Sequence, residues 1–185
     1  MNRLIALCVL AVAASACGDP QMAYTDPPAG ALRLVKNSMS NGKKVVLDFV
    51  VGDTALTGYS TGFDLPLDNS KVKLAASTPG TGLNPGSAPV AANAMLPGDG
   101  PLHGVLVVGL SQKATGAGAV ETDTTLAPGT LLYTVELDAV EHPDDGVVFD
   151  GTAKNFVLPS GGLRNKAGMT VVDASQVKIG KLELR

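Results

Sequence analysis

Residues 43–51 (KKVVLDFVV) and 58–67 (GYSTGFDLPL) carry the two clearest structural signals in this chain. The first run follows Asn41-Gly42, a pair typical of the two-residue turn in a β-hairpin, and an earlier β-rich run at residues 32–37 precedes that turn. In the second run every other residue is large or β-branched: Tyr59, Thr61, Phe63, Leu65 and Leu67. Strict alternation predicts a strand with one buried face.

Short runs with the composition of strands continue to the C-terminus, separated by turn signals and without a helical period. In residues 130–140 (TLLYTVELDAV), one face is expected to hold Leu131, Tyr133, Val135 and Leu137. Residues 176–184 (QVKIGKLEL) would need a bulge near Gly180 to keep their apolar side chains on one face. The other predicted strands are residues 72–76, 102–110, 121–126, 147–150, 155–158 and 169–173.

These runs predict an all-β fold with about nine strands, arranged as a two-sheet antiparallel β-sandwich of jelly-roll or immunoglobulin-like type. Residues 77–101 are rich in Pro, Gly, Ala and Asn and are expected to form a long loop with at most one weak strand at residues 90–96. Such a loop is either a binding surface or an insertion without function.

The N-terminus has the pattern of an export signal. Arg3 precedes an uncharged apolar run at residues 4–13, which is too short for a spanning helix of roughly 20 residues. Ala14-Ser15-Ala16-Cys17 then places small residues before a cysteine. We therefore expect residues 1–16 to be a signal peptide, residues 17–31 to be a modified N-terminus with a flexible tether, and residues 32–185 to be one β-sandwich domain.

The segment around Cys17 resembles the lipobox of bacterial lipoproteins, which implies acylation of Cys17 and attachment to the cell envelope. Cys8 is the only other cysteine, and it lies in the expected leader, so Cys17 would have no intramolecular disulfide partner after cleavage. Gly18 after the cysteine favours the outer membrane over the inner membrane. Because Ala-Ser-Ala also suits the ordinary signal peptidase, a secreted protein with an unmodified Cys17 is the alternative.

Composition excludes some functions. Removal of residues 1–16 leaves 13 basic and 17 acidic residues, a formal charge of −4, with no basic cluster for nucleic acid. Trp is absent and only 4% of residues are aromatic, so ring stacking on a glycan would depend on Tyr24, Tyr59 or Tyr133. A protein partner is therefore expected ahead of a glycan.

No catalytic or zinc motif occurs, and we expect a protein that is not an enzyme and needs no cofactor. An enzyme would require Asp64 and Asp144 to converge with His103 or His142. Calcium could be held by loop oxygens, and the weak candidate ligands are Asp64, Asp68, Asn69, Asp144 and Asp145. Turn formation accounts for these loop residues equally well.

The order of the strand-like segments resembles a cohesin or a carbohydrate-binding module. The segments that carry this resemblance are KKVVLDFVVGD, GYSTGFDLPLDNSKVKL, LHGVLVVGL, PGTLLYTVELDAV and SQVKIGKLEL. The resemblance spans most of residues 32–185 and implies a β-sandwich that mediates binding of a protein or a glycan. The alternative function is that of a structural or assembly subunit of an outer-membrane or other envelope complex.

Overall fold

The computed structural model describes residues 20–85, 89–97, 103–113, 122–141 and 143–185. These residues form fifteen strands and one 3-10 turn, so the all-β prediction is confirmed. The expected leader and Cys17 lie outside the described residues. The strands are β1 (Met22–Thr25), β2 (Leu32–Lys36), β3 (Lys44–Val51), β4 (Leu56–Gly58), β5 (Ser60–Leu67), β6 (Val72–Pro79), β7 (Val90–Pro97), β8 (Gly104–Ser111), β9 (Thr124–Leu126), β10 (Leu131–Ala139), β11 (Gly146–Asp150), β12 (Gly161–Arg164), β13 (Thr170–Val172), β14 (Val177–Lys178) and β15 (Lys181–Leu184).

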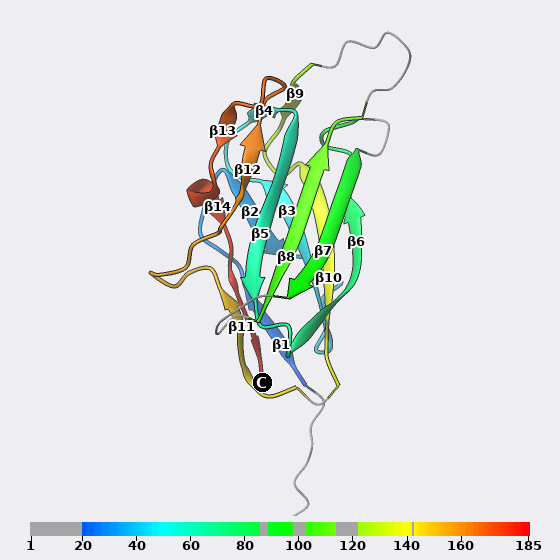
Figure 1. Cartoon of the computed structure of the whole chain (residues 1–185), viewed down its shortest axis with the longest axis vertical. Helices are drawn as coiled ribbons and strands as arrows, with labels where there is room; N and C mark the ends of the chain where they lie inside the picture. Colours follow the sequence, from blue (N-terminus) through cyan, green and yellow to red (C-terminus); the bar gives the residue numbers. More distant parts are fainter. Residues whose placement is uncertain (1–19, 86–88, 98–102, 114–121, 142) are drawn as a thin grey trace, which may run out of the picture.

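The strands form four sheets (Figure 1). Two sheets have five strands, in the orders β14-β2-β3-β10-β6 and β13-β12-β5-β8-β7. Smaller sheets pair β1-β15-β11 and β4-β9. All pairings are antiparallel except that of β14 with β2. The expected count of about nine strands was too low, because β1, β4 and β12 lie where no strand was expected and residues 176–184 form two strands, β14 and β15.

Alternation along the strands builds the core between the two five-stranded sheets. On β5, Phe63 and Leu65 are buried, whereas Asp64 between them is partly exposed. Phe63 meets Phe49 of β3 edge to face, with ring centroids 4.8 Å apart. The buried side chains of both sheets belong to one hydrophobic cluster. This arrangement is consistent with a β-sandwich.

The hairpin predicted around Asn41-Gly42 is present, because β2 and β3 pair antiparallel. Asn41 and Lys44 form a bridge, so the two central residues of the turn are Gly42 and Lys43, one position later than predicted. The predicted face of residues 130–140 is correct for Tyr133, Val135 and Leu137 but wrong for Leu131. An irregularity between Leu131 and Tyr133 shifts the register of β10 against β3, so that Leu132 is buried and Leu131 is 39% exposed.

The expected flexible tether at residues 17–31 was wrong for residues 22–25. These residues form β1, which pairs with β15 at the C-terminal end of the chain. Met22 and Tyr24 point into the core and are 7% and 8% exposed. The sequence did not predict this strand, because it is short and the residues around it are rich in Pro and Gly, a composition typical of linkers.

Residues 176–184 do not form one bulged strand. The chain leaves one sheet after β14 and enters another at β15, with Ile179 and Gly180 between them. Residues 155–158 form no strand either and belong to the connection between β11 and β12. In the segment expected as a long loop at residues 77–101, β6 extends to Pro79 and β7 occupies the place of the one weak strand.

Candidate functional site

The outer surface of β5, β8 and β7 is a grid of small and apolar residues. The register of the two strand pairs aligns its twelve outward positions in four rows. We call this surface the β5–β8–β7 face. Its rows are Pro66, Val105 and Leu96; Asp64, Val107 and Ala94; Gly62, Gly109 and Ala92; and Ser60, Ser111 and Val90.

Alternation explains why these residues face outward. Along β8, Leu106, Val108 and Leu110 are buried in the core, so Val105 and Val107 must lie on the opposite side of the sheet. The outward residues of β5 and β8 are partly exposed in the same alternating pattern.

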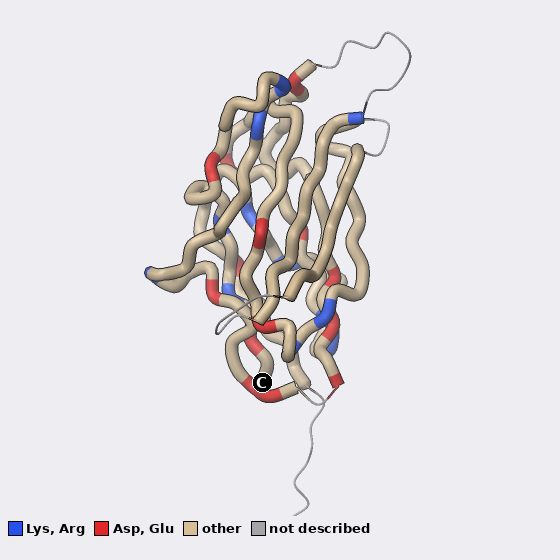
Figure 2. Tube along the Cα trace, viewed as in Figure 1, with Lys and Arg blue, Asp and Glu red and all other residues tan. Residues whose placement is uncertain are grey.

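Asp64 is the only charged residue in β5, β7 and β8 (Figure 2). Its carboxylate has no hydrogen-bond or ion-pair partner among the described residues. Val90 and Leu96 on β7 are 55% and 47% exposed. A mainly apolar sheet face with one unpartnered carboxylate is therefore open to contact from outside.

Next to Asp64 the surface has a recess of about 190 Å³, lined by Gly62, Gly161 and Gly162 among other residues. A Cβ on Gly62 would overlap the carbonyl oxygen of Val108, and one on Gly162, whose φ is 116°, would overlap that of Val172. The recess therefore exists because the backbone there excludes side chains. Arg164 at its margin donates to the carbonyl oxygen of Gly168 and to the Thr170 hydroxyl.

The outer side of the other five-stranded sheet has a different character. Lys44 Nζ lies 2.6 Å from Glu136 Oε2 across β3 and β10. The carboxylate of Asp48 accepts hydrogen bonds from Thr134 at 2.7 Å and from Asn37 at 2.7 Å. These polar groups are paired with one another, which leaves the β5–β8–β7 face as the more apolar of the two outer surfaces.

The five candidate calcium ligands, Asp64, Asp68, Asn69, Asp144 and Asp145, belong to separate segments of the chain. Asp64 lies within β5, whereas Asp68 is in the turn before β6 and Asp144 and Asp145 precede β11. Within the described ranges, no three His, Cys, Asp or Glu side chains group closely enough to hold a metal ion. Asp64, Asp144 and His103 therefore form no such group either, and His142 lies outside the described residues.

Lys71 contacts both loop regions that hold candidate calcium ligands. Its Nζ is 3.6 Å from Asp68 Oδ2 and donates to the carbonyl oxygen of Asp144 at 3.1 Å. Desolvation raises the pKa of Asp68, but hydrogen bonds from Ser70 and the charges of Lys71 and His103 outweigh it, so the pKa lies below its usual value. Asp68 thus acts as a turn residue that is paired with a lysine.

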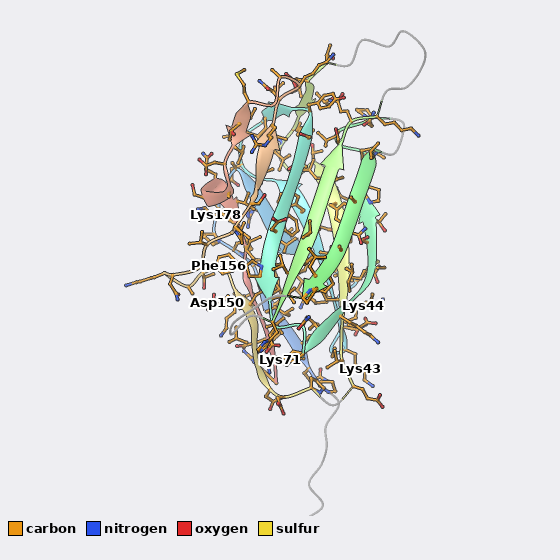
Figure 3. The ribbon with its side chains drawn as sticks, viewed as in Figure 1. Lys43, Lys44, Lys71, Asp150, Phe156 and Lys178 are labelled. Carbon is orange, nitrogen blue, oxygen red and sulfur yellow. The ribbon has the colours of Figure 1, made fainter. Side chains whose placement is uncertain are left out.

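Two larger hollows lie away from the β5–β8–β7 face. One has a volume of about 610 Å³ and lies between Pro20, the turn at Asn41 and the end of β10. Lys43 and Lys44 are among the residues that line it (Figure 3). The other, of about 460 Å³, includes Phe156 and Lys178, which lie on the opposite side of the view. Both are open at the surface. In the second hollow the Ser175 hydroxyl donates to the Asp173 carboxylate, and Asp173 also caps the 3-10 turn at Ala174–Gln176.

Comparison of the chain with protein-family models, curated proteins and solved structures finds no match. Among the described residues, no helix has the length and apolar character needed to cross a membrane.

From the sequence, the candidate binding features were the loop carboxylates and the long loop at residues 77–101. The sequence did not predict that β5, β8 and β7 together form one exposed face. Alternation in β5 and β8 gave part of the signal, because it marks which residues point outward. The pairing of β7 with β8, which completes the grid, had no signal beyond the weak strand at residues 90–96.

Proposed function

We propose that the protein is a non-enzymatic cell-envelope lipoprotein that is anchored through Cys17 and binds a protein partner through the β5–β8–β7 face. In this proposal the two five-stranded sheets form one β-sandwich of jelly-roll or immunoglobulin-like type. The observation that carries the binding function is the grid of twelve outward residues with a single ionisable group. Exposed apolar surfaces of this kind are typical of interaction sites.

The aromatic residues support a protein partner over a glycan. Five of the seven are buried: Tyr24, Phe49, Phe63, Tyr133 and Phe149. Tyr59 and Phe156 are partly exposed, and neither belongs to the β5–β8–β7 face. A pyranose ring on this face would therefore have no aromatic ring on which to stack.

The anchor rests on the sequence around Cys17 and on the position of β1. The chain from Cys17 to the first residue of β1, Met22, can span at most roughly 17 Å when fully extended. A lipid on Cys17 would hold the domain close to the membrane surface. The outer membrane is the proposed location.

Site-specific photocrosslinking in the native host tests the binding function. A photoreactive residue at Val107 should capture a partner in the envelope, whereas one at Thr134 on the other outer surface should not. The purified partner should then bind the purified protein, and Gly109→Arg should weaken that binding at least roughly tenfold, which corresponds to about 1.4 kcal/mol.

Equal capture from both surfaces, or unchanged binding by Gly109→Arg, would argue against this face. If the captured proteins are all subunits of one stable envelope complex, the assembly-subunit function would be favoured.

The mass of the mature protein from the membrane fraction tests the anchor. We expect acyl mass on the natural chain and none on Cys17→Ser, which should be released from the membrane. An unacylated and released natural chain would leave a secreted binding protein.

A further inference from the structure

The strand β7 ends its sheet with an unpaired edge. It pairs with β8 on one side, and none of its backbone groups bonds to any other described residue. In an antiparallel pair, alternate residues direct their N–H and C=O groups away from the partner strand. The free side of β7 therefore presents a row of backbone donors and acceptors.

Within the described part of the chain, this edge has no charge, proline or register shift over residues 90–96, which are features that protect many edge strands. The edge strand of the other five-stranded sheet, β6, carries Lys73 and has a register shift against β10. The remaining edges of the two five-stranded sheets, β13 and β14, have three and two residues. Only β7 offers a long and uncharged edge among these four.

The sequence of β7 is nearly palindromic about Asn93. Residues 89–97 read PVAANAMLP, so that positions equally distant from Asn93 hold similar side chains. Going outward, the matched pairs are Ala92 and Ala94, Ala91 and Met95, Val90 and Leu96, and Pro89 and Pro97. A two-fold interface places each residue opposite its mirror position, so this pattern suits a second copy of the same strand.

We propose that β7 pairs antiparallel with β7 of a second copy of this chain, about a two-fold axis through Asn93. Directly opposed residues share a face of the sheet, so a continuous sheet requires outward residues to oppose outward residues. Registers centred on a residue meet this condition. Centring on Ala94 would bring Pro97, which has no N–H, into the ladder, whereas centring on Asn93 pairs residues 90–96 with roughly six to eight hydrogen bonds.

The pairing has two consequences beyond the proposed binding function. Val90 and Leu96, which are 55% and 47% exposed, would cover each other across the axis. The two β5–β8–β7 faces would join on one side of a continuous sheet, and the dimer would then offer two adjacent copies of the binding surface. No charged side chain on either β7 would oppose the association.

Disulfide trapping tests the register. The full chain carrying Cys8→Ser and Cys17→Ser would receive one new cysteine at a time. Asn93→Cys should form a linked dimer under mild oxidation, because opposed Cα atoms lie about 4.5–5.5 Å apart. Val90→Cys and Leu96→Cys should each form no disulfide-linked dimer, since the same residue in two copies would be about 20 Å apart, but a mixture of the two should link. Linking that ignores this pattern would overturn the proposed register.

Sedimentation velocity tests the association itself. The unsubstituted full chain should show twice the monomer mass as its concentration rises. Ala92→Lys brings two ammonium groups into diagonal positions near the axis and should abolish the dimer. At concentrations where the unsubstituted chain is monomeric, the thermal unfolding midpoints of the two should be equal. Thr78→Lys on the β6 edge is the matched control and should leave the dimer intact. A monomeric unsubstituted chain at its highest soluble concentration, or a dimer that survives Ala92→Lys, would overturn the proposal.

Discussion

The hydroxyl of Tyr24 accepts a hydrogen bond from the N–H of Gly180 at 2.9 Å and donates one to the carbonyl oxygen of Leu34 at 2.6 Å. One phenol therefore joins β1, β2 and the link between β14 and β15. A Cβ on Gly180 would overlap the carbonyl oxygen of Thr25 and lie 2.7 Å from the Tyr24 oxygen, so glycine is required there. The position where the chain changes sheets is thus fixed by a buried polar contact.

Replacement of Tyr24 by Phe should lower the free energy of unfolding by about 1–3 kcal/mol, because it leaves the Gly180 N–H without its partner in the core. Tyr133→Phe is the matched control, since the buried Tyr133 hydroxyl has no hydrogen-bond partner among the described residues. That change should be neutral or stabilising. Urea unfolding of both variants measures the difference, and equal losses would contradict the role of the Tyr24 hydroxyl.

Stability should fall at alkaline pH because of the same tyrosine. Desolvation raises the pKa of Tyr24 well above its usual value of 10.0, with a smaller increase from Asp26, and the Gly180 N–H and Arg33 offset only part of this. The unfolded chain therefore loses this proton first, so the contribution is complete below about pH 10 and is lost as the pH rises further. Unfolding midpoints measured between neutral and strongly alkaline pH should decline less in Tyr24→Phe than in the natural chain.

Two glycines of the β13-β12-β5-β8-β7 sheet should respond in opposite ways to alanine. Gly109 has no atom near its would-be Cβ, so Gly109→Ala should be neutral or stabilise by up to about 1 kcal/mol. Gly162 has a φ of 116° and no room beside Val172, so Gly162→Ala should destabilise by about 1–3 kcal/mol or more. Thermal unfolding distinguishes the two. A destabilised Gly109→Ala would show that other atoms occupy the space beside Gly109 at the centre of the β5–β8–β7 face.

The contact between the two five-stranded sheets can be measured at Phe49 and Phe63. Phe63→Leu and Phe49→Leu should each destabilise the protein, and the double variant should lose less than the sum by about 0.5–1.5 kcal/mol, because the edge-to-face contact is removed only once. A coupling energy near zero in this double-mutant cycle would mean that the rings do not meet in solution.

Asp68 should contribute to stability only above the acid range. The pKa of Asp68 lies below its ordinary value of 3.8, so its contribution is present above that value and is lost as the pH falls through the lower, folded-state pKa. Because this residue is near the surface, Asp68→Asn should cost less than about 1 kcal/mol at neutral pH and nothing at strongly acid pH. Chemical unfolding at the two pH values tests this, and a loss that persists in acid would point to the turn hydrogen bonds instead of the charge.

The part of the site that could be predicted follows strand alternation. The pattern of residues 58–67 correctly marked Thr61, Phe63, Leu65 and Leu67 as buried, and so placed Asp64 on the outside. It was wrong for Tyr59, which precedes β5 and is partly exposed. The same reasoning failed at Leu131, where an irregularity in register moves the buried position to Leu132. The loop carboxylates were a weaker guide, because Asp residues that form turns and Asp residues that hold a cation have the same local pattern.

The sequence by itself determined the all-β class, the hairpin at Asn41-Gly42 and the inward faces of the longest strands, because the two-residue period of a strand is a local property of the backbone. The tertiary structure alone decided which strands are neighbours. β1 pairs with β15 from the other end of the described chain, and β7 completes the face through its register with β8. Such partners are chosen by hydrogen bonding and burial between distant segments, for which no local pattern exists.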